Sequence, residues 1–88
     1  MFNGKYKMTK VKPKHGLPKD VHNNVLGKVC EIVDADVGFP AIIKYYKDEE
    51  SFSLIYTSRV VDVNVTHFVP TTMVVIETKN TVYVLEKI

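Results

Sequence analysis

Residues 52–86 read FSLIYTSRVVDVNVTHFVPTTMVVIETKNTVYVLE, and this stretch decides the fold. Apolar and polar residues alternate through its middle with a period of two, which is typical of antiparallel strands with one buried face. The opposite face of the middle run is expected to carry Val60, Asp62, Asn64 and Thr66. Val61, Val63 and Val65 share the other face of that run, and the residues expected to contribute to one core are Val61, Val63, Val65, Ile76, Tyr83 and Leu85.

The last two runs of this stretch are separated only by Lys79 and Asn80. Asparagine tolerates the positive φ that the primed turns of two-residue hairpins require. We therefore expect a hairpin here with Asn80 at positive φ. The whole region predicts a meander of three to four strands.

Three shorter runs before residue 52 also have strand character, at residues 5–11, 28–33 and 41–47. In the first run Tyr6 and Met8 share a parity that Val11 does not. A bulge near Thr9 is expected to bring all three onto one face. Residues 13–27 contain two prolines and two glycines and predict a long loop, which in a small domain is more often functional than accidental.

The pattern as a whole predicts an all-β fold, a small antiparallel barrel or sandwich of six to seven short strands in a single domain covering residues 1–88. No stretch has the 3.6-residue periodicity of a helix longer than about two turns. The order of elements resembles the SH3-like barrel. Residues 13–27 stand in place of that fold's long first loop, and the C-terminal hairpin is an addition.

The composition favours a soluble protein of a reducing compartment. The chain has 88 residues, 45% of them apolar, which suits one small core. Cys30 is the only cysteine, so no internal disulfide can form. The chain has no apolar leader and no apolar run of membrane-spanning length, so a cytoplasmic location and no membrane partner are expected.

The net charge of +2 is unevenly distributed. Residues 1–28 carry seven lysines against one acid, a net +6, whereas residues 29–88 carry five basic side chains against nine acids, a net −4. Such asymmetry indicates a surface that attracts a polyanion or an acidic protein. Lysines that protect an edge strand from aggregation would give the same pattern, and both interpretations stay open.

No catalytic, metal or cofactor motif occurs in the chain. Cys30 falls within an expected strand, where a buried thiol is unreactive. The histidines at 15, 22 and 67 do not combine with Cys30 at a zinc spacing. Asp34 and Asp36 resemble the opening of a calcium loop, but Tyr45 occupies the position of its bidentate glutamate. We expect no enzyme, no cofactor and no metal.

Lysines and tyrosines interleave at residues 5–7 and 44–47, which suits a surface that follows a phosphate backbone while rings stack on bases. The alternative is that the rings belong to the core and the lysine stems flank them. The candidate binding residues combine the basic N-terminal strand, the long loop and the tyrosine pair: Lys5, Tyr6, Lys7, Lys10, Lys12, Lys14, His15, Lys19, Tyr45 and Tyr46.

The segments TSRVVDV (57–63) and IETKNTVYVL (76–85) are similar to the ends of short proteins encoded by tailed phages and other bacterial mobile elements. The resemblance implies an origin and assigns no functional residue. It favours a non-enzymatic accessory protein that binds and modulates a host protein. The alternative is a nucleic-acid-binding module that uses the lysine-rich N-terminal face. A small-nucleotide binder with the long loop as lid is the least favoured.

Overall fold

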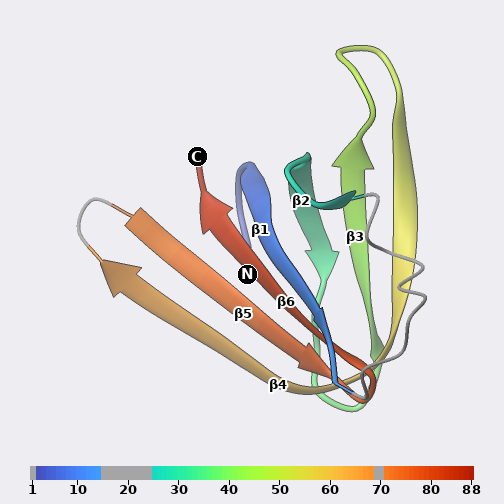
Figure 1. Cartoon of the computed structure of the whole chain (residues 1–88), viewed down its shortest axis with the longest axis vertical. Coiled ribbons are helices and arrows are strands. Elements are labelled where there is room, and N and C mark those ends of the chain that lie inside the picture. Colours follow the sequence, from blue (N-terminus) through green and yellow to red (C-terminus); the bar gives the residue numbers. More distant parts are fainter. Residues whose placement is uncertain (1, 15–24, 69–70) are drawn as a thin grey trace.

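The computed structural model describes residues 2–14, 25–68 and 71–88. Within them each strand pairs antiparallel with the next, and the last pairs with the first, so that one sheet closes into a barrel (Figure 1). The predicted all-β antiparallel fold is confirmed. The strands are β1 (Tyr6–Pro13), β2 (Val29–Asp34), β3 (Pro40–Tyr46), β4 (Phe52–Phe68), β5 (Thr71–Thr78) and β6 (Thr81–Lys87).

The described residues include no helix with the length and apolar character needed to cross a membrane. The connections follow the expected order, with the longest between β1 and β2 and a two-residue turn between β5 and β6. The acidic turn after β3 is held by Asp48, whose Oδ1 accepts hydrogen bonds from the backbone N–H groups of Glu50 (2.8 Å) and Ser51 (2.9 Å).

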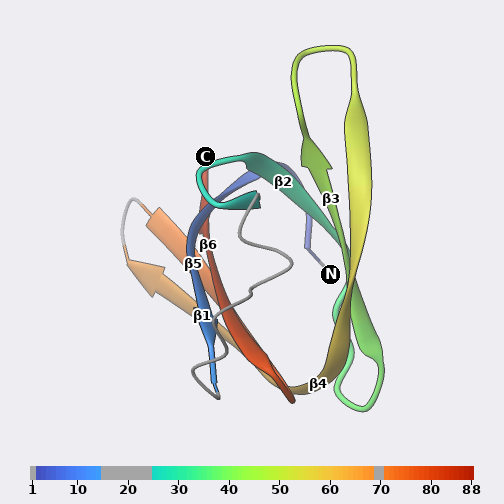
Figure 2. The ribbon, with the colours of Figure 1, turned by 45° about the vertical axis from the view of Figure 1, so that its right-hand side comes forward.

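Strand β4 is a single element of 17 residues that serves both halves of the sheet. Residues 52–59 pair with β3, and residues 60–68 pair with β5. Where the change occurs, Thr57 Oγ1 accepts a hydrogen bond from the Ala41 N–H (2.9 Å) and donates one to the Ser58 carbonyl (2.7 Å). Figure 2 shows the result, in which the β3–β4 hairpin and the β4–β5 hairpin extend in different directions from the barrel.

The expected bulge in β1 is confirmed. The register between β1 and β6 shifts between Met8 and Lys10, and the Thr9 hydroxyl donates to the Val84 carbonyl (3.2 Å). As a result Tyr6 and Met8 are buried and Val11 packs against the core from the same side. One extra residue in one strand is enough to correct the parity of the whole run.

The core fills the barrel between the two halves of the sheet. Ile76, Tyr83 and Leu85 are buried, as predicted, and so are Cys30 and Ile32. The largest fully buried side chains come from β1, β3, β5 and β6 and are Tyr83, Met8, Ile43, Ile76 and Leu85.

The predicted position of Val61 is wrong. A second register shift lies between Val60 and Asp62 in β4, so that Val60 is fully buried while Val61 is 46% exposed. The alternation counted along the sequence placed Val61 inside and Val60 outside. The bulge exchanges the two, and Val63 returns to the inner face opposite Ile76, where it packs against the core.

Val65 is not a core residue either, although its direction was predicted correctly. It pairs with the buried Val74 and therefore faces the same side of the sheet. Val74 in turn pairs with the buried Leu85 of β6, so Val65 lies level with β6. It remains 43% exposed because pairing with β3 ends at Arg59 and no described strand lies beside Val65 on that side of β4.

The expected positive φ at Asn80 is also wrong, since the only described residues with positive φ are glycines. The turn is held by the buried Thr78 side chain instead. Its Oγ1 accepts from the Thr81 N–H (3.0 Å) and donates to the Thr81 carbonyl (2.8 Å). The Arg59 carbonyl accepts a further bond from the Lys79 N–H (2.9 Å), which fixes the turn to β4.

Candidate functional site

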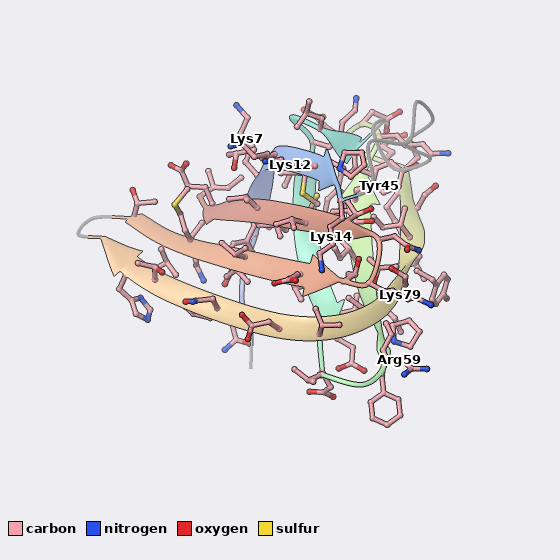
Figure 3. All side chains as sticks on the ribbon, turned by 60° about the horizontal axis from the view of Figure 1, so that its bottom comes forward. Lys7, Lys12, Lys14, Tyr45, Arg59 and Lys79 are labelled. Atoms are coloured by element: carbon pink, nitrogen blue, oxygen red, sulfur yellow. The ribbon has the colours of Figure 1, made fainter. Side chains whose placement is uncertain are left out.

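The structure separates the predicted binding residues into two kinds. Tyr6 and Tyr45 are 4% and 8% exposed, so their rings belong to the core and are not available for stacking. Tyr46 lies half-buried on the outer surface. His15 and Lys19 lie outside the described residues. The exposed cations are Lys5, Lys7, Lys10, Lys12 and Lys14, and Figure 3 shows three of them along and beyond β1.

A row of large apolar side chains covers the outer surface of β3 and the first half of β4. Phe52, Leu54 and Tyr56 are 54%, 43% and 61% exposed, and the residues between them point inward. Each lies directly opposite a β3 residue that also faces outward. We call this surface the aromatic face, defined by Ile42, Lys44, Tyr46, Phe52, Leu54 and Tyr56.

Charged side chains organise one end of the aromatic face. The Tyr46 and Phe52 rings meet edge to face, with their centroids 6.4 Å apart. The Lys44 ammonium lies 4.2 Å from the Phe52 centroid and 5.2 Å from that of Tyr46, while Lys5 approaches Tyr46 to 4.9 Å. Glu31 accepts a hydrogen bond from the Tyr46 hydroxyl and lies 3.9 Å from the Lys44 ammonium. These contacts hold the exposed rings in a defined arrangement.

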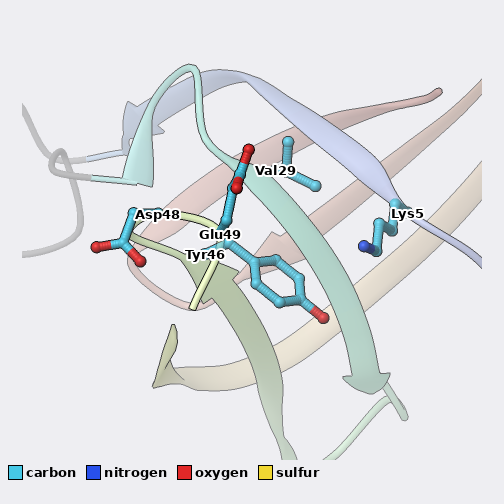
Figure 4. A pocket seen from close by; sticks show the side chains of 5 residues that line it. All are labelled: Lys5, Val29, Tyr46, Asp48 and Glu49. Carbon is cyan, nitrogen blue, oxygen red and sulfur yellow. The ribbon is translucent and has the colours of Figure 1, made fainter. Parts of the chain in front are cut away.

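A cavity of about 400 Å³ borders this end of the aromatic face, lined by Lys5, Val29, Tyr46, Asp48 and Glu49 (Figure 4). Its walls combine one ring, one aliphatic side chain and charges of both signs. A cavity of this kind can receive a single side chain from a partner.

A second charged surface lies at the opposite end of β1, where the β5–β6 turn meets it. The Lys14 N–H donates to the Asn80 carbonyl (2.8 Å) and the Lys79 N–H donates to the Arg59 carbonyl (2.9 Å), which brings three basic residues to one end of the barrel (Figure 3). The Lys14 ammonium is paired with Glu77 at 2.5 Å. We call this surface the basic end, defined by Lys12, Lys14, Arg59 and Lys79.

The described residues offer no activated nucleophile at Cys30 and no metal cluster. Burial raises the pKa of the Cys30 thiol to about 11, and a hydrogen bond with the backbone of Met8 opposes this rise only in part. At neutral pH the group is a protonated, enclosed thiol. No group of three or more His, Cys, Asp and Glu side chains gathers within the described part of the chain.

Sequence reasoning found Tyr46 but missed the rest of the aromatic face and half of the basic end. Phe52, Leu54 and Tyr56 share one parity of a run whose other parity carries Ser53, Ile55 and Thr57. Alternation alone would place the three large apolar side chains inside, and only the register with β3 places them outside. Arg59 and Lys79 gave no signal, because only the turn geometry brings them to Lys14.

No protein-family model, curated protein sequence or solved structure matches this chain.

Proposed function

We propose that the chain is a small non-enzymatic binding protein, a phage or mobile-element accessory protein that binds a bacterial host protein in the cytoplasm and modulates it. The proposed contact surface is the aromatic face. The origin rests on the resemblance of residues 57–63 and 76–85 to proteins of such elements. The free thiol of Cys30 suits a reducing compartment.

The observation that carries the proposal is the contiguous exposure of Phe52, Leu54 and Tyr56. Single exposed apolar residues are normal on soluble proteins, but a continuous apolar row marks an interaction site. Tyrosine and phenylalanine are enriched at the centres of protein interfaces, where charged residues are depleted. Here the only charge in the middle of the face, Lys44, lies over a ring.

The charges around the aromatic face favour a protein partner over a nucleic acid. Binding to a phosphate backbone needs several uncompensated cations along the track. Lys44 is compensated by Glu31, and the adjoining turn carries Asp48, Glu49 and Glu50. The mixed charges instead form the polar rim that surrounds a protein interface.

The test compares two variants that each remove one exposed phenylalanine. Phe52→Ser alters the aromatic face, and Phe39→Ser alters the β2–β3 loop at a similar exposure of 65%. Tagged wild type and both variants are used to capture proteins from a nuclease-treated bacterial lysate. We expect a defined partner with wild type and Phe39→Ser and its loss with Phe52→Ser. Equal capture by Phe52→Ser would refute the aromatic face as the contact surface.

The basic end supports a second candidate function, nucleic-acid binding. Lys12, Arg59 and Lys79 are exposed there, and Lys7 and Lys10 extend the surface along β1. In this case retention on heparin should be strong and should fall steeply with salt. Replacing Lys12, Arg59 and Lys79 with Gln should then abolish retention, whereas Phe52→Ser should leave it unchanged.

A further inference from the structure

The second half of β4 is a sheet edge on the side away from β5. Pairing with β3 ends at Arg59, and Val60 makes the last backbone hydrogen bonds on that side, with Gly38 and Phe39 (both 2.9 Å). From Val61 to His67 no described residue pairs with this side of the strand. Figures 1 and 3 both show β4 as the outermost strand there. We call this segment the β4 edge.

Exposed edges normally carry features that prevent pairing with another chain, such as lysine, proline or an inward-pointing charge. The β4 edge reads VDVNVTH and contains neither lysine, arginine nor proline. Its two protective features, the bulge at Val61 and the carboxylate of Asp62, both lie at its beginning and leave the rest of the edge without any. The contrast with β1 is direct, since that strand carries a lysine at almost every second position. The β4 edge is therefore open to the addition of another strand.

We propose that the β4 edge pairs antiparallel with the β4 edge of a second copy of this chain, about a two-fold axis at Asn64. Directly opposing residues in an antiparallel pair project to the same side of the sheet, so the axis must pass through a residue. Asn64 is the midpoint between Val61 and His67. An axis at Asn64 therefore pairs the whole edge, while every other axis leaves part of it open.

The charges of the edge select the same axis. Asp62 is the one acidic residue in it, and an axis at Asn64 places Asp62 opposite Thr66 of the second copy. The two carboxylates are then about 14 Å apart along the pair, at roughly 3.4 Å per residue, beyond the screening length of about 8 Å in physiological salt. An axis at Val63 would bring them to about 7 Å, and an axis at Asp62 would oppose them directly.

The inner side of the edge also matches itself. The axis at Asn64 sets Val63 of each copy opposite Val65 of the other, which joins two half-covered valines across the interface. Val65 is 43% exposed in the single chain because no described strand lies beside it on the open side of β4. Pairing of the edges covers it and makes the main-chain hydrogen bonds that the edge lacks.

In the proposed dimer the two-fold axis places residue 64 of one copy directly opposite residue 64 of the other, and the experiment tests this contact. Asn64→Lys and Asn64→Glu each place like charges in direct opposition. Size-exclusion chromatography with light scattering should show wild type as a dimer and each variant as a monomer. Circular dichroism should show that both variants are folded. An equimolar mixture of the two variants should recover the dimer. Asn80→Lys, the matched control, adds the same charge at an exposed turn that meets β4 at Ser58 and Arg59, outside the β4 edge, and should stay dimeric.

A wild type that stays monomeric up to submillimolar concentration would overturn the proposal, even if it bound an extended peptide of another protein. So would a dimer that either Asn64 variant leaves intact, or a variant mixture that stays monomeric. The aromatic face is unchanged in all these variants, so capture of a partner protein through Phe52 is tested separately.

Discussion

The Lys44 ammonium lies 4.2 Å from the centroid of the Phe52 ring, on the surface of the barrel rather than within it. The two residues belong to neighbouring strands, and Glu31 holds the same ammonium from a third strand at 3.9 Å. The contact gives an exposed phenylalanine a fixed neighbour and keeps a positive charge at the centre of the aromatic face. A partner protein would therefore meet an ordered surface.

Lys44→Gln should separate binding from folding. Exposed cation–π contacts and ion pairs each contribute at most about 1 kcal/mol, so the free energy of unfolding in urea should change little. Association with the captured partner should slow and become less dependent on salt, because a charge at the contact surface acts mainly on the on-rate. Lys10→Gln makes the same charge change on β1 and should bind like wild type. Equal binding kinetics for both variants would contradict the prediction.

Val60 and Val61 test the bulge in β4. Val60→Ala should lower the free energy of unfolding by about 2 kcal/mol, because it removes buried methyl groups and leaves a cavity. Val61→Ala should stay within about 0.5 kcal/mol of wild type, because Val61 is 46% exposed. Urea denaturation of the two variants measures both values. The reverse order of stability would mean that the bulge is absent.

Thr78 should matter more to the β5–β6 turn than Asn80 does. Thr78→Val keeps the shape of a fully buried side chain but leaves the Thr81 N–H without its acceptor, which should cost about 1–3 kcal/mol. Asn80→Gly should not stabilise the protein, because Asn80 has no positive φ to relieve. Thermal unfolding of both variants checks the order. If Asn80→Gly stabilised the protein, the turn would be of the primed type predicted from the sequence, and the prediction made here would be wrong.

Cys30 should give stability a dependence on alkaline pH. The thiol pKa rises from 9.0 to about 11 on folding, so between these values the unfolded chain binds fewer protons than the folded one. The contribution of this thiol to the free energy of unfolding is therefore fully present below pH 9. Between pH 9 and about pH 11 it falls by about 1.4 kcal/mol per pH unit. Cys30→Ala should lack this part of the decline when urea titrations are compared across that range. A thiol reagent at pH 8 should react with Cys30 only after unfolding.

The sequence was informative wherever strand periodicity was undisturbed. The runs that contain Ile76, Tyr83 and Leu85 pair with each other without a bulge, so burial alternates along both strands and the three residues are inside as predicted. The bulge at Thr9 could be inferred, because Val11 breaks the parity of Tyr6 and Met8 visibly. The bulge at Val61 could not be inferred, because Val60 and Val61 are both valines and either of them can occupy the buried position without breaking the apolar–polar alternation.

The binding surfaces were less predictable than the core, for a physical reason. Tyr45 and Tyr46 are adjacent tyrosines, and only the register of β3 decides that the first is buried and the second is not. Arg59 and Lys79 are 20 positions apart and come together through a turn held by a hydroxyl. Surfaces built from several strands depend on register and turn geometry, which local patterns do not specify.

The pairing of β1 sets the order in which the barrel can form. β1 pairs with β2 only at Tyr6 and Lys7, but pairs with β6 from Tyr6 to Pro13, across a separation of 75 positions between Thr9 and Val84. A chain emerging from the ribosome makes its first strand long before that strand's main partner. High contact order of this kind predicts folding in milliseconds to seconds, with β1 the last strand to dock. The lysines of β1 then keep this unpaired strand soluble until β6 has been synthesised and can pair with it.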